Sequence, residues 1–322
     1  MKTDLAARLV DALNDIHGVH AGRRAVHAKG VCCTATFTAT PEAARLTTAA
    51  HMQGAPVSAT VRFSNGSGSP TRHDGARDGR GIATKYHLSD GATTDIVALT
   101  LPVFFVRTPE DFLEFTRAQK PDPETGKPDL ARVEAFVNAH PESHTAVAHA
   151  MFVQPPACYS KCRYFGIHAF KWIDAVGNER FVRYRWEPEA GEATITEDES
   201  RAQDRHYLRT ELARCLNEGP VAFTLDLQLS AEGDDPTDPT LMWPDERQIV
   251  TAGRLEITGL VEDQERDCEA LVFDPTRVTD GIECSDDKIL HARPLAYSVS
   301  HERRTSTGKG RLSSSRGGES KR

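Results

Sequence analysis

The sequence predicts an α+β fold in which an antiparallel sheet of about eight strands closes into a β-barrel with surrounding helices. Two observations carry this prediction. Short runs rich in β-branched and aromatic residues, separated by Gly, Asn and Asp, recur along the chain and are typical of antiparallel strands. Stretches with apolar residues at helical spacing lie before, between and after these runs. The 322 residues are enough for one large domain or two ordinary ones.

The first eighteen residues form an amphipathic stretch that we expect to be helical. Leu5 and Leu9 lie on one side of it, and Asp4 and Asp11 interrupt it, so it lacks the apolar core of a signal peptide. No apolar run elsewhere approaches the roughly 20 residues that cross a bilayer. We therefore expect a soluble, cytoplasmic protein without a membrane span.

The remaining predicted elements are two groups of strands and the helices between and after them. Strands are predicted at residues 31–39, 57–64, 81–88 and 94–105, and again at 164–173, 179–186, 221–229 and 253–261. Helical spacing occupies residues 109–149, between the groups, and returns near 198–216. A final helix is predicted from Ser285, a good N-cap residue followed by two acidic residues, through Leu290, Arg293 and Tyr297.

The charge of the chain argues against one class of partner. Its 47 acidic and 39 basic residues give a net charge of -8, whereas a nucleic-acid surface needs a basic face, so no nucleic acid is expected. Residues 305–322 differ from the rest, because they hold five basic residues and one acidic residue among Ser and Gly. Such a composition buries little apolar surface, so we predict a folded unit over residues 1–304 and a disordered basic tail over 305–322.

The seven cysteines are scattered and fit no metal-ligand spacing. Cys158 and Cys162 are close enough in sequence to be ligands, but no second pair completes a site with them. The expectation is therefore reduced thiols in a cytosolic protein.

The candidate catalytic residues are few. His27 lies just ahead of the first predicted strand, and a lone histidine is more often structural than catalytic. Arg62 and Ser64 alternate on a strand, so both side chains point to one face. An arginine on an otherwise apolar strand needs an anion. A carboxylate partner is expected, and a surface salt bridge is the simpler interpretation.

Arg293 and Tyr297 are four residues apart on the last predicted helix and therefore share a face. A guanidinium beside a phenol favours the phenolate form, and a phenolate is a good ligand for ferric iron. His301 and Arg304 continue this face. Taken alone, an Arg and a Tyr at this spacing are usually part of an ordinary helix surface.

Several segments, taken together and in order, resemble the catalase family. They are R-x-x-H-A-K-G from Arg24 to Gly30, V-R-F-S from Val61 to Ser64, R-D-x-R-G-x-A-x-K from Arg77 to Lys85, P-x-F-F from Pro102 to Phe105, F-D-P from Phe273 to Pro275, G-I-E from Gly281 to Glu283, D-K-x-L from Asp287 to Leu290, and R-x-x-x-Y from Arg293 to Tyr297. Two weaker similarities are the segment G-I-H-A-F-K from Gly166 to Lys171 and the Trp243-Pro244 pair. Each segment alone is weak evidence, but their shared order is specific. The chain looks shorter than a full catalase and resembles the small catalase-related heme peroxidases, which implies a catalase-like barrel lacking the C-terminal helical domain.

The resemblance implies that residues 1–304 hold heme b. Tyr297 would be the phenolate ligand of the iron, with Arg293 keeping it ionised. His27, oriented by Ser64, would be the catalytic residue on the opposite, distal face of the heme. The implied cofactor-binding residues are Arg24, Arg62 and Arg304 at the heme propionates and Val26, Phe63 and Phe104 in the pocket wall. The propionates would also supply the carboxylate that the arginine on the strand needs.

The sequence departs from the family in one position that matters for function. Catalases have two asparagines before P-x-F-F, and the first donates a hydrogen bond to bound peroxide. Counting back from Pro102 places Leu99 and Thr100 at these positions. Because leucine cannot orient a second hydrogen peroxide for oxidation, we expect at most weak catalase activity. We expect a peroxidase that reduces hydrogen peroxide or organic hydroperoxides with a small organic electron donor.

Two alternatives stay open at this point. One is a hydroperoxide isomerase of the allene oxide synthase type, which consumes hydroperoxide without a reductant. The other is a non-catalytic heme-binding protein that keeps the fold. By the same resemblance, the long N-terminal arm of full catalases is expected to be absent, which implies a monomer or a small homo-oligomer rather than the family's tetramer.

Overall fold

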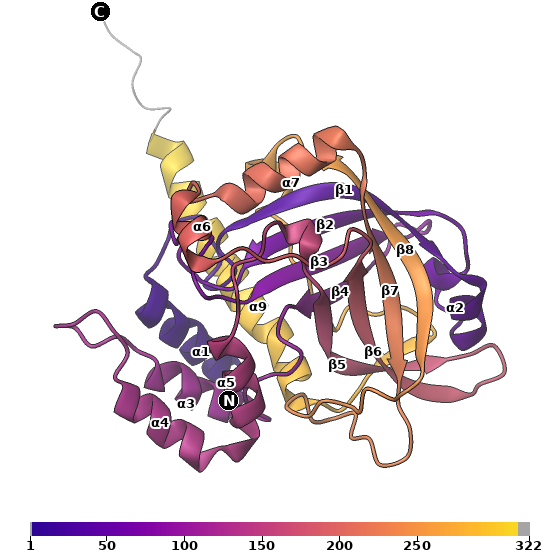
Figure 1. The fold of residues 1–322 in the computed structure, drawn as a ribbon, viewed down its shortest axis with the longest axis horizontal. Helices are drawn as coiled ribbons and strands as arrows, with labels where there is room; N and C mark the ends of the chain where they lie inside the picture. Colours follow the sequence, from indigo (N-terminus) through magenta and orange to yellow (C-terminus); the bar gives the residue numbers. More distant parts are fainter. Residues whose placement is uncertain (1, 315–322) are drawn as a thin grey trace, which may run out of the picture.

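The computed structural model describes residues 2–314, in which a β-barrel lies beside a group of helices (Figure 1). The strands are β1 (Gly30–Ala39), β2 (Val57–Asn65), β3 (Arg80–His87), β4 (Thr93–Leu99), β5 (Tyr164–Ile173), β6 (Glu179–Pro188), β7 (Val221–Leu229), β8 (Ile249–Leu260) and β9 (Ile282–Cys284). The helices are α1 (Lys2–His17), α2 (Pro41–Leu46), α3 (Pro109–Ala118), α4 (Leu130–Ala139), α5 (His144–Met151), α6 (Glu197–Ala202), α7 (Tyr207–Glu218), α8 (Gln264–Asp267) and α9 (Lys288–Ser314).

The eight long strands form the closed antiparallel barrel that the sequence predicts. Their order is β4-β3-β2-β1-β8-β7-β6-β5, and β4 pairs with β5 through Leu99 and Phe165, which closes the ring. The short strand β9 pairs with another part of β5. It was not predicted, because three residues are too few to show a strand pattern.

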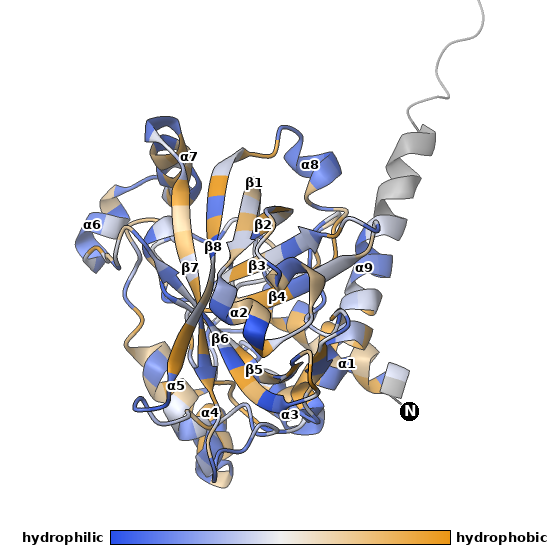
Figure 2. Cartoon of the chain, turned by 90° about the vertical axis from the view of Figure 1, so that its right-hand side faces the viewer, coloured by the Kyte–Doolittle hydropathy of each residue, from blue (hydrophilic) through white to orange (hydrophobic). Residues whose placement is uncertain are grey.

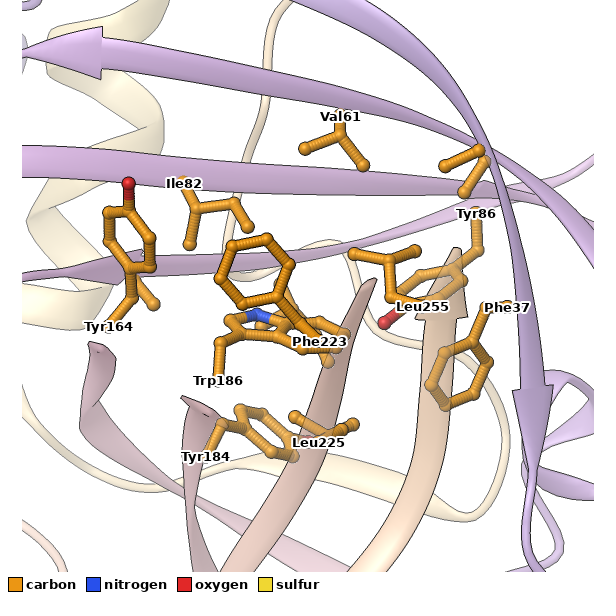
Figure 3. Close-up of a cluster of buried hydrophobic side chains, with 14 of the residues drawn as sticks. Phe37, Val61, Ile82, Tyr86, Tyr164, Tyr184, Trp186, Phe223, Leu225 and Leu255 are labelled. Carbon is orange, nitrogen blue, oxygen red and sulfur yellow. The ribbon is translucent and has the colours of Figure 1, made fainter. Parts of the chain in front are cut away.

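The interior of the barrel is filled by apolar and aromatic side chains (Figure 3). Phe37, Trp186 and Phe223 are fully buried there, and Phe37 meets Trp186 edge to face at a ring separation of 6.3 Å. Apolar and polar segments alternate along the strands in Figure 2, as expected when every second side chain faces the interior. The barrel is therefore a packed core, and a large ligand has to bind outside it.

Helices α1, α3, α4 and α9 gather on one side of the barrel, whereas α2 and α7 pack against β8. Helix α1 packs against α9 and α3, with Leu9 of α1 and Leu113 of α3 in one buried apolar cluster. A second cluster joins Phe115 of α3 and Phe136 of α4 to Ile289 near the start of α9. In Figure 1, α9 runs beside the barrel, between it and α1. A ligand bound between the barrel and α9 would therefore contact this helix.

Several predicted boundaries are wrong. The helical range 109–149 is divided into α3, α4 and α5, and β8 begins at Ile249 rather than at residue 253. The strand predicted over residues 94–105 ends at Leu99, and the segment that follows contains Pro102, which has no N–H for a sheet. The last helix is capped not by Ser285 but by Asp287, whose Oδ1 accepts hydrogen bonds from the backbone N–H groups of Ile289 at 2.8 Å and Leu290 at 3.2 Å. Helix α9 accordingly begins at Lys288.

Helix α9 extends into the tail predicted over residues 305–322, whose disorder stays a prediction. Helix α9 continues through residues 305–314, because the helical backbone established by the packed part of α9 extends into this polar stretch. Residues 315–322 lie outside the described part of the chain.

The cysteine prediction is wrong for one pair. Cys32 on β1 and Cys268, just after α8, form a disulfide between residues 236 positions apart. Cys33, Cys158, Cys162, Cys215 and Cys284 are free thiols, as predicted. Spacing could not reveal the pair, because only the closed fold brings the two residues together. Structural disulfides are rare in the cytosol, so the cysteines no longer support a cytoplasmic location.

No helix within residues 2–314 is both long and apolar enough to cross a bilayer.

Candidate active site

His27 lies in the loop before β1 with its backbone in the left-handed region, at φ 54°. This conformation is costly for a residue with a Cβ and is found mainly where surrounding contacts enforce it. Its backbone N–H donates to the Gly66 carbonyl at 3.0 Å, and its Nδ1 lies 3.0 Å from the Ser64 hydroxyl oxygen. The imidazole is thus held over the outer face of β2.

Four residues form one row across neighbouring strands beneath His27. Gly30 pairs with Ser64, Ser64 with Gly81, and Gly81 with Leu99. Directly opposed residues of an antiparallel sheet point to the same face, so Ser64 and Leu99 flank Gly81 on the side that His27 covers. A Cβ at Gly81 would lie 3.2 Å from the His27 Cε1 atom. Glycine is therefore what allows the imidazole to approach the sheet.

The surroundings of His27 keep its imidazole in the neutral form. Desolvation is the largest of the causes that lower the pKa of His27, which falls to about 3. The positive charges of Arg62 and Arg293 lower it further in the same direction. The imidazole is therefore neutral near pH 7, with one ring nitrogen free of a proton.

Arg62 is buried beside His27. Its side chain is on the same face as Ser64, and its Nη2 donates to the His27 carbonyl at 2.9 Å. A Cβ at Gly30 would lie 2.5 Å from the Arg62 guanidinium, so the glycine makes room for it. Desolvation and the charge of Arg24 lower the pKa of Arg62 to about 9. Arg62 is thus a buried cation in an electropositive site.

The three arginines expected at one place do meet, around residues 268–271. Arg24 donates to the Cys268 and Leu271 carbonyls at 3.2 and 2.8 Å, and Arg304 donates to the Leu271 carbonyl at 3.1 Å. The Glu269 carboxylate pairs with Arg24 and lies 3.7 Å from the Nη2 atom of Arg62. Glu269 is therefore a carboxylate partner of the kind that the strand arginine requires.

The pair on α9 has the predicted geometry. Arg293 donates from Nε to the Tyr297 phenol oxygen at 2.8 Å, and a terminal nitrogen of Arg293 lies 2.8 Å from His168 Nε2. Because an arginine side chain can only donate, Nε2 of His168 accepts this hydrogen bond. The Nδ1–H group of His168 then donates to Asp287 at 2.6 Å. Burial lowers the pKa of His168, and Asp287 opposes that shift. A buried chain of hydrogen bonds therefore orients Arg293 toward the phenol.

The loop that carries His27 lies against α9. The Ala25 N–H donates to the Ser300 hydroxyl at 3.4 Å, three residues beyond Tyr297. The positive charge of Arg293 is among the causes that lower the pKa of His27. The His27 and Tyr297 groups thus belong to one site between the barrel and the last helix.

The predicted wall residues do not all meet there. Val26 is half-buried next to His27. Phe104 lies beside the helices, with its ring 5.0 Å from that of Phe112. Phe63 alternates with Arg62 and Ser64, so its ring points into the barrel core, where it stacks on Tyr159 at 5.5 Å. The structure does not bring Phe63 to the face that carries His27.

Four residues of this site, His168, Asp287, Gly81 and Glu269, were not predicted from the sequence to have a role in it. His168 and Asp287 fall within segments that resemble catalases, so a signal for them was present. Gly81 also lies in such a segment. Glu269 lies in none, and no pattern in the sequence points to it.

A packed antiparallel barrel with a histidine–serine pair on its outer face, next to a helix that carries an arginine–tyrosine pair, is the combination of fold and side chains expected of the catalase family. A model of the catalase family matches residues 7–316. The chain belongs to the catalase family.

Relatives and solved structures of this family are similar over most of the chain. The catalase-related peroxidase of Mycolicibacterium paratuberculosis is 41% identical over 302 residues, which cover 94% of this chain and 95% of that protein. The catalase-related peroxidase of Synechococcus elongatus is 34% identical over 298 residues, covering 92% and 88%. A solved bacterial catalase superposes with a TM-score of 0.81 at 26% identity, and the match covers 88% of this chain and 58% of that one.

Proposed function

We propose that this protein is a heme-dependent peroxidase that reduces hydrogen peroxide or organic hydroperoxides with a small organic donor. Three contacts carry the proposal: His27 with Ser64 on the barrel, Arg293 with Tyr297 on α9, and the hydrogen bond from Ala25 to Ser300 that joins the His27 loop to α9. Its similarity to two catalase-related peroxidases, at 41% and 34% identity, supports the same reaction class, an oxidoreductase that acts on peroxide.

The residues fit a heme. Three arginines meet at one end of the site, and two carboxylates of a porphyrin would find donors there. The Nε atom of Arg62 is buried and has no hydrogen-bond partner among the described residues, so this guanidinium has a donor to spare. Tyr297 would ligate the iron through its phenol oxygen. Arg24, Arg62 and Arg304 would bind the propionates, with Val26 and Phe104 beside the ring. We assign heme b as the cofactor on the family resemblance.

When bound, the heme supplies the ferric iron at which peroxide binds and is reduced. The histidine does the proton chemistry: His27 removes the proton from one peroxide oxygen and returns it to the other, which then leaves as water or an alcohol. Ser64 holds the imidazole through Nδ1, and this contact would leave the other ring nitrogen free to exchange a proton with the peroxide. Arg293 donates a hydrogen bond to the phenol oxygen of Tyr297 and would hold that oxygen in position to ligate the iron.

The apolar side chain of Leu99, next to His27, favours peroxidase turnover over catalase turnover. Leu99 lies in the same sheet row as Ser64 and Gly81, directly beside the glycine that His27 covers. A leucine offers no donor to a second hydrogen peroxide, but it tolerates the carbon chain of an organic hydroperoxide. Neither the isomerase nor the non-catalytic alternative gains support from the relatives described above, which are named as peroxidases and catalases.

Steady-state turnover on heme-loaded protein tests this proposal. Oxygen release from hydrogen peroxide is compared with oxidation of a phenolic donor by hydrogen peroxide and by an alkyl hydroperoxide. We expect donor oxidation with both peroxides and little oxygen release. Rapid oxygen release, or hydroperoxide loss that needs no donor, would overturn the proposal.

A spectral experiment tests the ligand separately. Tyr297→Phe should lose the phenolate-type absorption of the bound heme and much of the heme itself. Tyr207→Phe is the matched control, because the Tyr207 hydroxyl donates to the Pro156 carbonyl at 2.8 Å, away from the site. An unchanged spectrum in Tyr297→Phe would refute the ligand assignment.

A further inference from the structure

A groove lies between the residues that follow β4 and the end of α5. It has a volume of about 350 Å³ and is lined by Thr100, Leu101, Ala148, His149, Phe152 and Val153. Pockets that bind organic molecules begin at about 300 Å³, so this one has room for such a ligand. Four of the six lining residues are apolar, and none is Lys, Arg, Asp or Glu. We call it the α5 groove.

The apolar side chains at the end of α5 contribute little to the core. Of the residues in α5, only Ala146 is buried. Met151 and Phe152, where the helix ends, are 61% and 77% exposed. A phenylalanine left in water forgoes the stabilisation that its burial would provide, and adjacent exposed apolar side chains mark interaction sites and ligand grooves. Phe152 is therefore available to a ligand.

The α5 groove is continuous with the row of residues beneath His27. Thr100 extends the pairing of β3 with β4, because its N–H donates to the Arg80 carbonyl at 2.9 Å and its hydroxyl oxygen accepts from the Arg80 N–H at 2.9 Å. The next pair along these two strands is Gly81 with Leu99. The wall of the groove is thus one residue away from the row that His27 covers.

Leu101 extends this connection on the face that carries His27. Gly79 precedes β3, and its carbonyl accepts at 2.8 Å from the N–H of the residue that follows β2, so the strand pairing reaches Gly79. Gly79 and Gly81 are two residues apart and therefore share a face. The atoms nearest to a Cβ at Gly79 belong to Leu101, at 3.8 and 3.9 Å. Leu101 and Leu99 thus form an apolar path from the groove to His27.

A neighbouring cavity is less suited to a hydrocarbon chain. It has a volume of about 200 Å³ and shares Thr100 and Val153 with the α5 groove. Five charged residues line it, namely Asp78, Arg80, Lys161, Arg163 and Glu192. A hydrocarbon chain placed there would take water away from charged groups without replacing its hydrogen bonds. The carbon chain of a substrate therefore favours the α5 groove.

The charges around the α5 groove indicate an uncharged ligand. Because its lining residues include neither Lys nor Arg, they offer no compensating charge to the carboxylate of a fatty-acid hydroperoxide. Arg77 reaches the end of α5, where it donates to the Met151 carbonyl at 3.3 Å, but its charge is paired with Glu197 at 2.6 Å. A neutral chain fits this surface better than an anionic one.

Resting on the proposed peroxidase function, we propose that the α5 groove binds the hydrocarbon chain of a neutral alkyl hydroperoxide and makes the protein selective for such substrates. The chain lies against Phe152 and Val153 of the groove. Leu101 and Leu99 connect the groove to His27, where the hydroperoxide group reacts. Hydrogen peroxide has no chain and gains nothing from the groove.

The first test compares kcat/KM of the heme-loaded protein for hydrogen peroxide and for the linear butyl, hexyl and octyl hydroperoxides. A fully buried methylene group strengthens binding about fourfold, so one that is half covered in an open groove should add about twofold. We therefore expect kcat/KM to rise about twofold per methylene group, through a falling KM. A series that stays flat or falls with chain length would overturn the proposal.

Two variants locate the effect in the groove. Phe152→Ser and Ala148→Glu alter exposed positions, so both should fold. We expect the ratio of kcat/KM for octyl hydroperoxide to that for hydrogen peroxide to fall about 10-fold in each. Val176→Ser is the matched control, because Val176 is 84% exposed in the turn between β5 and β6, and it should keep the wild-type ratio. A wild-type ratio in both groove variants would refute the assignment.

The charge of the ligand is tested with 8-hydroperoxyoctanoic acid, which carries a carboxylate at the end of a chain of the same length. At pH 7 the wild type should turn it over about 10-fold less efficiently than octyl hydroperoxide, because the carboxylate finds no partner in the groove. Equal kcat/KM values for the two compounds would refute a neutral occupant.

Saturation-transfer NMR with 1-octanol measures binding without turnover. The terminal methyl group of octanol should receive saturation from the wild type and from Val176→Ser, and less from Phe152→Ser. If the heme-loaded wild type reduces no peroxide, the proposed function is wrong and the inference falls with it. If it reduces peroxides but shows neither chain-length dependence nor a Phe152-dependent octanol contact, only the inference is wrong.

Discussion

Arg293 on α9 lies 2.8 Å from Nε2 of His168 on β5, although the two residues are 125 positions apart in the sequence. This contact connects the last helix to the barrel and fixes which way the guanidinium points. Its other partner, the Tyr297 phenol oxygen, is one turn further along the helix. The orientation of the candidate iron ligand thus depends on a strand that the helix meets only in the folded protein.

Replacing His168 by leucine should destabilise the fold. The change leaves Asp287 buried without its imidazole partner and Arg293 without one of its acceptors. Removing the imidazole donor from a buried carboxylate in this way costs about 3 kcal/mol. Urea unfolding measures the loss, and Lys120→Met, which removes an exposed ion pair with Asp15, should cost less than about 1 kcal/mol. An equal loss of unfolding free energy in the two variants would contradict the buried chain of hydrogen bonds from Asp287 through His168 to Arg293.

His27→Ala should slow the reaction with peroxide by about 100 to 10,000-fold, because general acid–base catalysis is lost. Heme should stay bound, since the variant leaves Tyr297 and the three arginines intact. Stopped-flow mixing of the loaded protein with peroxide measures the rate. His144→Gln, a change in an exposed histidine at the start of α5, is the control. A wild-type rate in His27→Ala would remove His27 from the mechanism.

Gly81→Ala should also slow peroxide reduction, because its Cβ would lie 3.0 Å from the Ser64 hydroxyl and 3.2 Å from the His27 ring. A displacement of the imidazole by up to about 1 Å lowers the rate of the reaction by up to about 100-fold. Gly79→Ala is matched to it, since there the nearest atom, in Leu101, is 3.8 Å away. The two variants are compared by the same stopped-flow rate, and similar rates would argue against a close approach of His27 to the sheet.

Folding stability should fall on acidification, and His51 offers the clearest measurement. His51 is buried against Tyr86, and burial lowers its pKa from 6.5 to about 4. Between these pH values the unfolded chain binds a proton that the folded protein does not, so the folded state loses stability as the pH falls from 6.5 toward 4. One such group changes the unfolding free energy by about 1.4 kcal/mol per pH unit.

Urea unfolding at several pH values between 7 and 4 measures this slope. His51→Gln should show a shallower decline than the wild type, whatever its stability at pH 7. His144→Gln, which alters an exposed histidine, should decline in parallel with the wild type. A parallel decline in His51→Gln would show that His51 is not the group that titrates.

Local patterns were sufficient for much of the fold. Most strand ranges agree to within a few residues, because a strand with one buried face needs alternating side chains. The exceptions have local causes that compete with the pattern. Pro102 removes an apolar run from β4, and Asp287 rather than Ser285 caps α9 because its carboxylate reaches two free N–H groups at once.

Part of the candidate site could be predicted for the same reason. Arg62 and Ser64 share a face because strands have a period of two, and Arg293 and Tyr297 meet because helices bring residues four apart together. The same period shows why Phe63 faces the barrel core, a consequence that the resemblance to a family did not take into account.

The sequence by itself determined the elements, the spacing of the candidate ligand pair and the segments by which the family is identified. Only the tertiary structure decided that Ser64, Gly81 and Leu99 share one row beneath His27, that His168 reaches Arg293, and that Cys32 is bonded to Cys268. The reason is physical: helix and strand periods act over a few residues, whereas register and barrel closure bring together residues whose separation along the chain carries no signal.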